Sequence, residues 1–283
     1  MQTLPIDFIK RGEFNLVHDD LLRTKYKNRF NVIDKFFNND IPPAAEMFKI
    51  LDDPKNPGHM PKVDGLKLSS AYNGHDFINL SMDAKSLKQG FKTLTVDDFL
   101  ANKYVVRKKV YITEKLLYKV NDLKSQNSEY SVSDDTQYFI DMYKDFRPVL
   151  EHYADELFPG AREEHQLNPA LSLIQYECPF ADEENIMEMK EFSTVAWGPE
   201  HCDGTLGALH LGENIQEFQA RDKNGEYKYI DELMDNNSLW FFGDLSRQYG
   251  WDPVYHRMIF NPNDRTFTRY SIIFNLYVKG IMY

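Results

Sequence analysis

The spacing of hydrophobic positions predicts helices in the first part of the chain, up to about position 165. Apolar residues recur there at intervals of three and four, which places them on one face of a helix. These residues are Phe139, Met142, Tyr143, Phe146, Val149, Leu150, Tyr153 and Leu157. Ser133, followed by two aspartates, predicts the N-cap and the acidic first turn of this helix. Pro148 should kink it, and Phe158-Pro159-Gly160 should end it.

A second helical region is expected upstream. The segment from Thr95 to Leu123 has the pattern of one or two helices that end in the polar stretch after it. It contains the basic cluster Arg107-Lys108-Lys109, which we interpret as a solvent-exposed helix face.

After position 165 the pattern changes to short apolar runs separated by turn residues. The expected strands are Leu171–Tyr176, Thr205–Leu211, Gln216–Ala220, Tyr227–Ile230, Leu239–Phe242 and Arg269–Val278. Asn224-Gly225 lies between the third and fourth of these runs and predicts a β-hairpin with a tight turn. Many short strands of this kind favour a sandwich or barrel, with the N-terminal helices packed on one sheet.

Composition restricts the classes of partner. The chain of 283 residues is 42% hydrophobic and 27% charged, which is typical of a globular protein, and its aromatic content of 14% suits a β-rich core. The formal net charge of −11 argues against a nucleic acid or an anionic membrane as the main partner, because both require a basic surface. No protein partner is implied.

The sequence also bears on the location of the protein and on the redox state of its cysteines. Two cysteines, Cys178 and Cys202, exclude a framework of disulfides. No apolar run approaches the roughly 20 residues needed to span a bilayer. The first residues lack the basic and apolar regions of a secretory signal, so we expect a cytoplasmic protein.

A candidate metal site begins with His201-Cys202-Asp203. On a strand, residues i and i+2 point to the same face, so the imidazole and the carboxylate can meet one ion. A third ligand from a distant strand, His256, would complete the arrangement of two histidines and one carboxylate that is typical of non-haem Fe(II) oxygenases. About one histidine is expected by chance to have an acidic residue two positions later in this composition, and we interpret His18-Asp19-Asp20 as such a match.

The chain's only Arg-x-Ser pattern follows the third candidate ligand. Arg269 and Ser271 should face the same side of a strand. A guanidinium offers a planar fork that matches a carboxylate, and the serine hydroxyl adds a further donor. This pair is suited to hold the far carboxylate of a 2-oxo diacid whose other end chelates iron.

Together, the order of these motifs from His201 to Tyr277 resembles the isopenicillin N synthase-like superfamily of 2-oxoglutarate- and Fe(II)-dependent oxygenases. The motifs are His201-Cys202-Asp203-Gly204, the hairpin, Trp240-Phe241-Phe242-Gly243-Asp244, His256-Arg257 and Arg269-Tyr270-Ser271. The resemblance implies a double-stranded β-helix (jelly-roll) core, Fe(II), 2-oxoglutarate as cosubstrate and O₂. It also implies that Tyr176 contacts 2-oxoglutarate, although Ile174 stands where the family commonly has Asn.

The expected architecture is therefore mainly β with flanking helices, in a single oxygenase domain over 1–283. Residues 1–165 form a helix-rich N-terminal part and 166–283 the jelly-roll core that carries the motifs. Asp244 is expected in a structural turn, and Cys202 is expected to point away from the metal.

The expected reaction is hydroxylation, desaturation or oxidative cyclisation of a small metabolite at an unactivated C–H bond. Amino-acid-derived precursors in natural-product biosynthesis are among the candidate substrates. Three alternatives stay open: an Fe(II) oxidase that needs no 2-oxo acid, another metal-dependent jelly-roll enzyme such as an isomerase, and a catalytically inert binding module.

Overall fold

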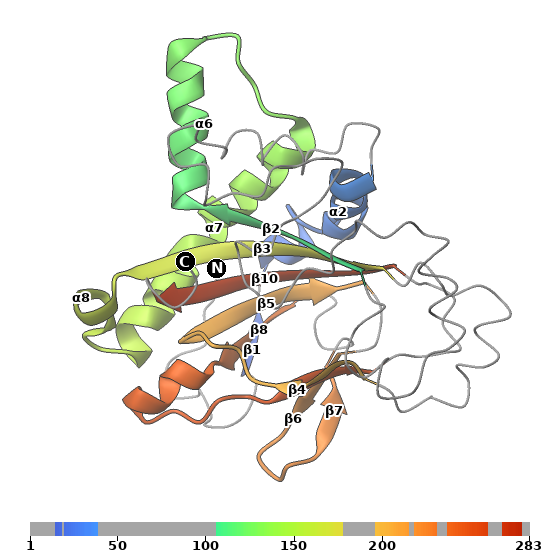
Figure 1. The fold of residues 1–283 in the computed structure, drawn as a ribbon, viewed down its shortest axis with the longest axis vertical. Helices are drawn as coiled ribbons and strands as arrows, with labels where there is room; N and C mark the ends of the chain where they lie inside the picture. Colours follow the sequence, from blue (N-terminus) through green and yellow to red (C-terminus); the bar gives the residue numbers. More distant parts are fainter. Residues whose placement is uncertain are drawn as a thin grey trace, which may run out of the picture.

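Two antiparallel sheets form the framework of the protein (Figure 1). The computed structural model describes residues 15–18, 20–38, 106–177, 196–214, 218–230, 237–259 and 268–278. The six-stranded sheet has the order β1 (Asn15–His18), β8 (Asn237–Phe242), β5 (Gly207–Glu213), β10 (Thr268–Val278), β3 (Leu167–Glu177) and β2 (Val106–Thr113). The four-stranded sheet has the order β4 (Ala196–His201), β9 (His256–Ile259), β6 (Phe218–Arg221) and β7 (Tyr227–Tyr229).

The helices come mostly from the N-terminal part. They are α1 (Asp20–Arg23), α2 (Arg29–Asn38), α6 (Glu114–Gln126), α7 (Asp134–Leu157) and α8 (Ala161–His165), with a short 3-10 helix, η3 (Asp244–Tyr249). The prediction for α7 is confirmed at both ends, since the Ser133 hydroxyl caps it by accepting a bond of 3.2 Å from the Thr136 amide. The helix continues through Pro148. Among the described helices, none has the length and apolar character required to cross a bilayer.

One face of the six-stranded sheet packs against these helices. Along β10, every second residue, beginning with Tyr270, is buried in the same core as the apolar face of α7. The rings of Tyr143 and Phe274 are 5.1 Å apart, and Tyr153 stacks on Trp240 at 4.8 Å. Figure 1 shows α2, α6 and α7 on one side of this sheet and the four-stranded sheet on the other.

The alternate residues of β10 face the four-stranded sheet. Arg269 is one of them: its guanidinium lies 5.9 Å from the ring of Phe218, which belongs to β6 in the other sheet. Ser271 follows two residues later, on the same face. The predicted polar pair is therefore buried between the sheets and away from the helices.

The helix predicted between Thr95 and Leu123 is wrong for its central part. Val106–Thr113 is strand β2, which pairs with β3 at the edge of the six-stranded sheet, and the helix α6 begins only at Glu114. β-Branched and aromatic residues fit this strand, and the basic residues of its first half are typical of edge strands. The basic cluster 107–109 is thus in a strand, and 95–105 lies outside the described residues.

The strand predictions after position 165 are largely confirmed. β6 and β7 form the expected hairpin, in which Gly225 adopts a positive φ of 82°. The six-stranded sheet also recruits β1 and β2 from the N-terminal part. One sheet is therefore built from both halves of the sequence.

Candidate metal centre

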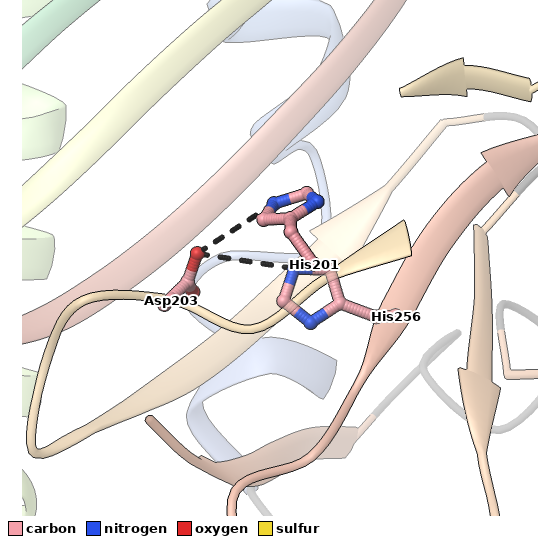
Figure 2. A group of neighbouring side chains, drawn as sticks. All are labelled: His201, Asp203 and His256. Carbon is pink, nitrogen blue, oxygen red and sulfur yellow. Dashed lines mark ion pairs between the residues drawn. The ribbon is translucent and has the colours of Figure 1, made fainter. Parts of the chain in front are cut away.

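Two histidines meet where the ends of two paired strands come together. His201 is the last residue of β4 and pairs in register with His256, the first residue of β9. Their rings are 4.4 Å apart. Asp203 Oδ1 lies 3.9 Å from His201 Nε2 and 3.8 Å from His256 Nε2, and Figure 2 shows the three side chains pointing toward one another. One potential ligand atom from each residue lies within 4.8 Å of the others.

The expectation that His201 and Asp203 share one strand is wrong. β4 ends at His201, and Asp203 lies in the connection that leads to β5. The carboxylate still reaches the imidazoles, so its position depends on what holds this connection.

Backbone hydrogen bonds from the segment that follows β8 hold the connection between β4 and β5 in place. The amide of Asp244 donates to the carbonyl of Asp203 at 2.7 Å, and the amide of Leu245 donates to the carbonyl of Thr205 at 3.2 Å. A Cβ on Gly243 would lie 2.8 Å from the Asp203 carbonyl and still closer to Thr205, so the two segments approach this closely only with glycine there. Gly243 and Asp244 therefore have a structural role, which is to position Asp203.

The environment of His256 favours its neutral form. The residue is buried, and burial lowers its pKa to about 4, an effect that His201 reinforces and Asp203 opposes. Its Nδ1 lies 3.3 Å from the carbonyl of Val254, which suits an N–H donor at Nδ1. Nε2 then carries the lone pair and faces Asp203.

This donor set fits a divalent transition metal. Two imidazole nitrogens and one carboxylate oxygen are the ligands of non-haem Fe(II) sites, and histidine ligates in its neutral form. Cys202 is not among the three: its Sγ lies 3.9 Å from Asp244 Oδ1, and burial raises the pKa of its thiol. The side chain of His18, the second His-x-Asp match, is outside the described residues.

The Arg-x-Ser pair lies near this centre, separated from it by one aromatic ring. Phe218 contacts both regions: its ring is 5.3 Å from the ring of His256 and 5.9 Å from the guanidinium of Arg269. Arg269 and Ser271 are both buried. Tyr176 pairs with Arg269 in backbone register, but its side chain is outside the described residues.

Sequence reasoning missed two residues of this region, Glu213 and His210. The Glu213 carboxylate is fully buried and forms an ion pair with Arg269 Nη2 through Oε2. Its other oxygen, Oε1, lies 2.9 Å from His210 Nε2. The guanidinium expected to bind a cosubstrate is therefore already in contact with a carboxylate of the chain itself.

A β-bulge brings these two residues together. In a regular strand, residues three apart face opposite sides. Ser271 pairs with Glu213, Ile272 with Gly212 and Ile273 with His210, so β5 contains one extra residue opposite β10. Gly212 has φ of 127°, a conformation that other residues rarely adopt. The glycine in His-Leu-Gly-Glu was the one sequence signal of this bulge.

No protein-family model and no curated protein matches the sequence. Among solved structures, a full-length Neurospora crassa protein in complex with alpha-KG and thymine is 14% identical with a TM-score of 0.49, over 94% of this chain and 76% of that one. Dioxygenase for auxin oxidation 1 of Arabidopsis thaliana, in a complex with 2-oxoglutarate, is 17% identical with a TM-score of 0.44, over 62% and 64%.

A Caulobacter crescentus protein, described as a member of the 2OG-Fe(II) oxygenase family, is 15% identical with a TM-score of 0.49, over 95% of this chain and 79% of that one. At such identities and TM-scores, these likenesses carry no conclusion about the chemistry of this chain.

Proposed function

We propose that the protein is a 2-oxoglutarate- and Fe(II)-dependent oxygenase. The observation that carries the proposal is the convergence of His201 and Asp203, from the end of β4 and the connection after it, with His256, from the start of β9, on one point. Two facing antiparallel sheets with this group at the end of the smaller one fit a jelly-roll core. We assign the whole chain, 1–283, to a single oxygenase domain.

The residues of the chain have distinct tasks in this proposal. His201, Asp203 and His256 would hold the metal. Arg269 and Ser271 bind the far carboxylate of 2-oxoglutarate, with Tyr176 beside them in β3. The buried Ser271 Oγ, which has no hydrogen-bond partner among the described residues, is suited to donate to a ligand.

Two aromatic rings lie beside His256, the one buried member of the three candidate ligands. The rings of Phe218 and Phe241 lie 5.3 Å and 6.0 Å from the ring of His256. Bound iron, with O₂ and 2-oxoglutarate, supplies oxidation of an unactivated C–H bond coupled to release of succinate and CO₂.

The substrate class in this proposal is a small metabolite, including amino-acid-derived natural-product precursors. The net charge of −11 disfavours nucleic acid and anionic membrane surfaces. Hydroxylation, desaturation and oxidative cyclisation all fit the site, because each begins with attack on a C–H bond. A cytoplasmic enzyme with no protein partner completes the proposal.

One observation favours a second candidate, an Fe(II) oxidase that uses no 2-oxo acid. Arg269 already has a carboxylate partner in Glu213, as it would if no second carboxylate had to bind there. An assay of O₂ consumption with and without 2-oxoglutarate, against pools of small acids and amino-acid derivatives, separates the two. Succinate formation belongs only to the first.

Metal binding tests the centre directly. Anaerobic titration with Fe(II) and 2-oxoglutarate should give a weak visible charge-transfer band with about one iron per chain. His201→Ala and His256→Ala should each abolish this band, whereas His152→Ala, at an exposed position on α7, should leave it unchanged. Iron binding that survives both histidine substitutions would refute the assignment.

A further inference from the structure

The carboxylate of Glu213 already pairs with Arg269, the residue proposed to bind the distal carboxylate of the cosubstrate. Its Oε2 forms an ion pair with Nη2 of Arg269, and both side chains are almost completely shielded from solvent. The bulge at Gly212 places Glu213 directly opposite Ser271, the second residue of the Arg-x-Ser pair. An internal carboxylate thus lies where the distal carboxylate of a 2-oxo diacid would bind.

We propose that Glu213 is a specificity-determining residue for the cosubstrate, and that it competes with the distal carboxylate of 2-oxo acids for Arg269. The inference rests on the proposed function and concerns the same site. A dicarboxylate must displace Glu213 before it can use both legs of the guanidinium fork. A 2-oxo acid without a distal carboxylate binds the metal without this displacement.

Charge accounts for the competition. Arg269 and Glu213 together are neutral, and they are buried at the same place. A second carboxylate beside this pair adds an uncompensated buried charge, which is strongly unfavourable. Binding of the dicarboxylate therefore depends on separating Glu213 from Arg269, with uptake of one proton by the Glu213 and His210 side chains so that the buried groups together stay neutral.

His210 is a second partner for the displaced carboxylate of Glu213. Glu213 Oε1 lies 2.9 Å from His210 Nε2, and His210 is buried between Phe218 and Phe241, with ring distances of 4.7 Å and 5.8 Å. Glu213 can keep His210 as its partner while Arg269 turns to the ligand. The pair thus has two arrangements, one without a dicarboxylate and one with it.

The test compares two 2-oxo acids on the intact Fe(II)-loaded chain under argon. 2-Oxoglutarate carries the distal carboxylate, and 2-oxobutyrate lacks it. Dissociation constants come from the charge-transfer band for the wild type, for Glu213→Gln and for Glu151→Gln. The last substitution is the matched control, because Glu151 pairs with Arg147 on α7, against the opposite face of the sheet.

Glu213→Gln should tighten 2-oxoglutarate binding by about tenfold or more, the worth of a charge-assisted hydrogen bond. It should change 2-oxobutyrate binding by less than about threefold, and the control should change neither. Unchanged or weaker 2-oxoglutarate binding in a folded Glu213→Gln protein would overturn the proposal while leaving the proposed function intact. Absence of a band with either acid in the wild type would refute both.

A second measurement uses the wild type and so does not depend on the folding of a variant. A crystal structure with Mn(II) and 2-oxoglutarate should show the distal carboxylate on Arg269 and Glu213 turned to His210. A structure in which 2-oxoglutarate is bound while Glu213 still holds Arg269 would contradict the inference.

Discussion

The side chain of Arg29 donates a hydrogen bond of 2.8 Å from Nε to the carbonyl of Leu211. Arg29 begins helix α2, and Leu211 is the residue before the bulge glycine in β5. The guanidinium is buried and also lies against the backbone of Gly212, where an added Cβ would meet Arg29 Nη2 at 2.9 Å. Helix α2, on one face of the sheet, thus stabilises the bulge that places the side chain of Glu213 on the other face.

Arg29→Met tests this relationship. It keeps much of the side-chain volume but removes the donor, so the buried carbonyl of Leu211 loses its bond to a charged group. We expect the free energy of unfolding to fall by about 1.5–3 kcal/mol, measured by urea denaturation. Arg23→Met, at an exposed position on α1, should change it by less than about 0.5 kcal/mol. Equal effects of the two substitutions would contradict a role for the bond.

Gly243→Ala should displace Asp203. The added methyl group would meet the backbone carbonyls of Asp203 and Thr205, so the connection before β5 must shift and the carboxylate must move from the imidazoles. We expect iron affinity to fall about tenfold or more, measured by anaerobic titration. Gly204→Ala is the matched control, because nothing lies within 4 Å of the Cβ it would add. If Gly204→Ala weakens iron binding as much, close packing at Gly243 is not the cause.

Most of the candidate site was accessible from the sequence because its residues form short local patterns. His201-x-Asp203 and Arg269-x-Ser271 each place two functional groups two positions apart, and the structure brings His256 to the first pair. The amphipathic spacing of α7 and the turn of the hairpin are equally local signals. Such patterns can be recognised in the sequence because they depend on residues that are close together in the chain.

What the sequence did not predict depends on contacts between distant segments. Val106–Thr113 has an ambiguous pattern, and its pairing with β3 makes it a strand. Asp203 is held by the amide of Asp244, some forty residues later in the chain, and not by strand geometry. Glu213 could not be placed beside Arg269, because the bulge appears only in the register between β5 and β10.

Arg269→Lys should weaken the binding of 2-oxoglutarate. Lysine keeps the charge, and so an ion pair with Glu213, but it cannot bind a carboxylate with two parallel N–H groups. We expect the dissociation constant for 2-oxoglutarate to rise about tenfold with iron binding intact, and that for 2-oxobutyrate to stay within about threefold. Arg221→Lys, which alters a partly exposed pair with Glu200, is the control. An unchanged constant for 2-oxoglutarate would favour the oxidase hypothesis.

The metal-free protein should lose stability in acid because His256 is buried. Burial holds the pKa of His256 at about 4 in the folded chain, below its ordinary value near 6.5. Between these two values the unfolded chain binds a proton that the folded chain does not, so stability rises with pH in this window. The contribution of His256 is therefore complete at about pH 7 and is lost as the pH falls toward 4.

His256→Asn isolates this effect, because asparagine does not titrate and its amide can still donate to the carbonyl of Val254. With a chelator present, the free energy of unfolding is measured by urea denaturation at pH 7.5 and pH 4.5. The wild type should lose about 2–3 kcal/mol more than His256→Asn over this interval. The reason is that the imidazole of His256 takes up a proton in the unfolded chain but stays neutral in the folded chain. Equal losses in the two proteins would show that His256 titrates normally, and its imidazole would then compete with protons for the metal throughout the acidic range.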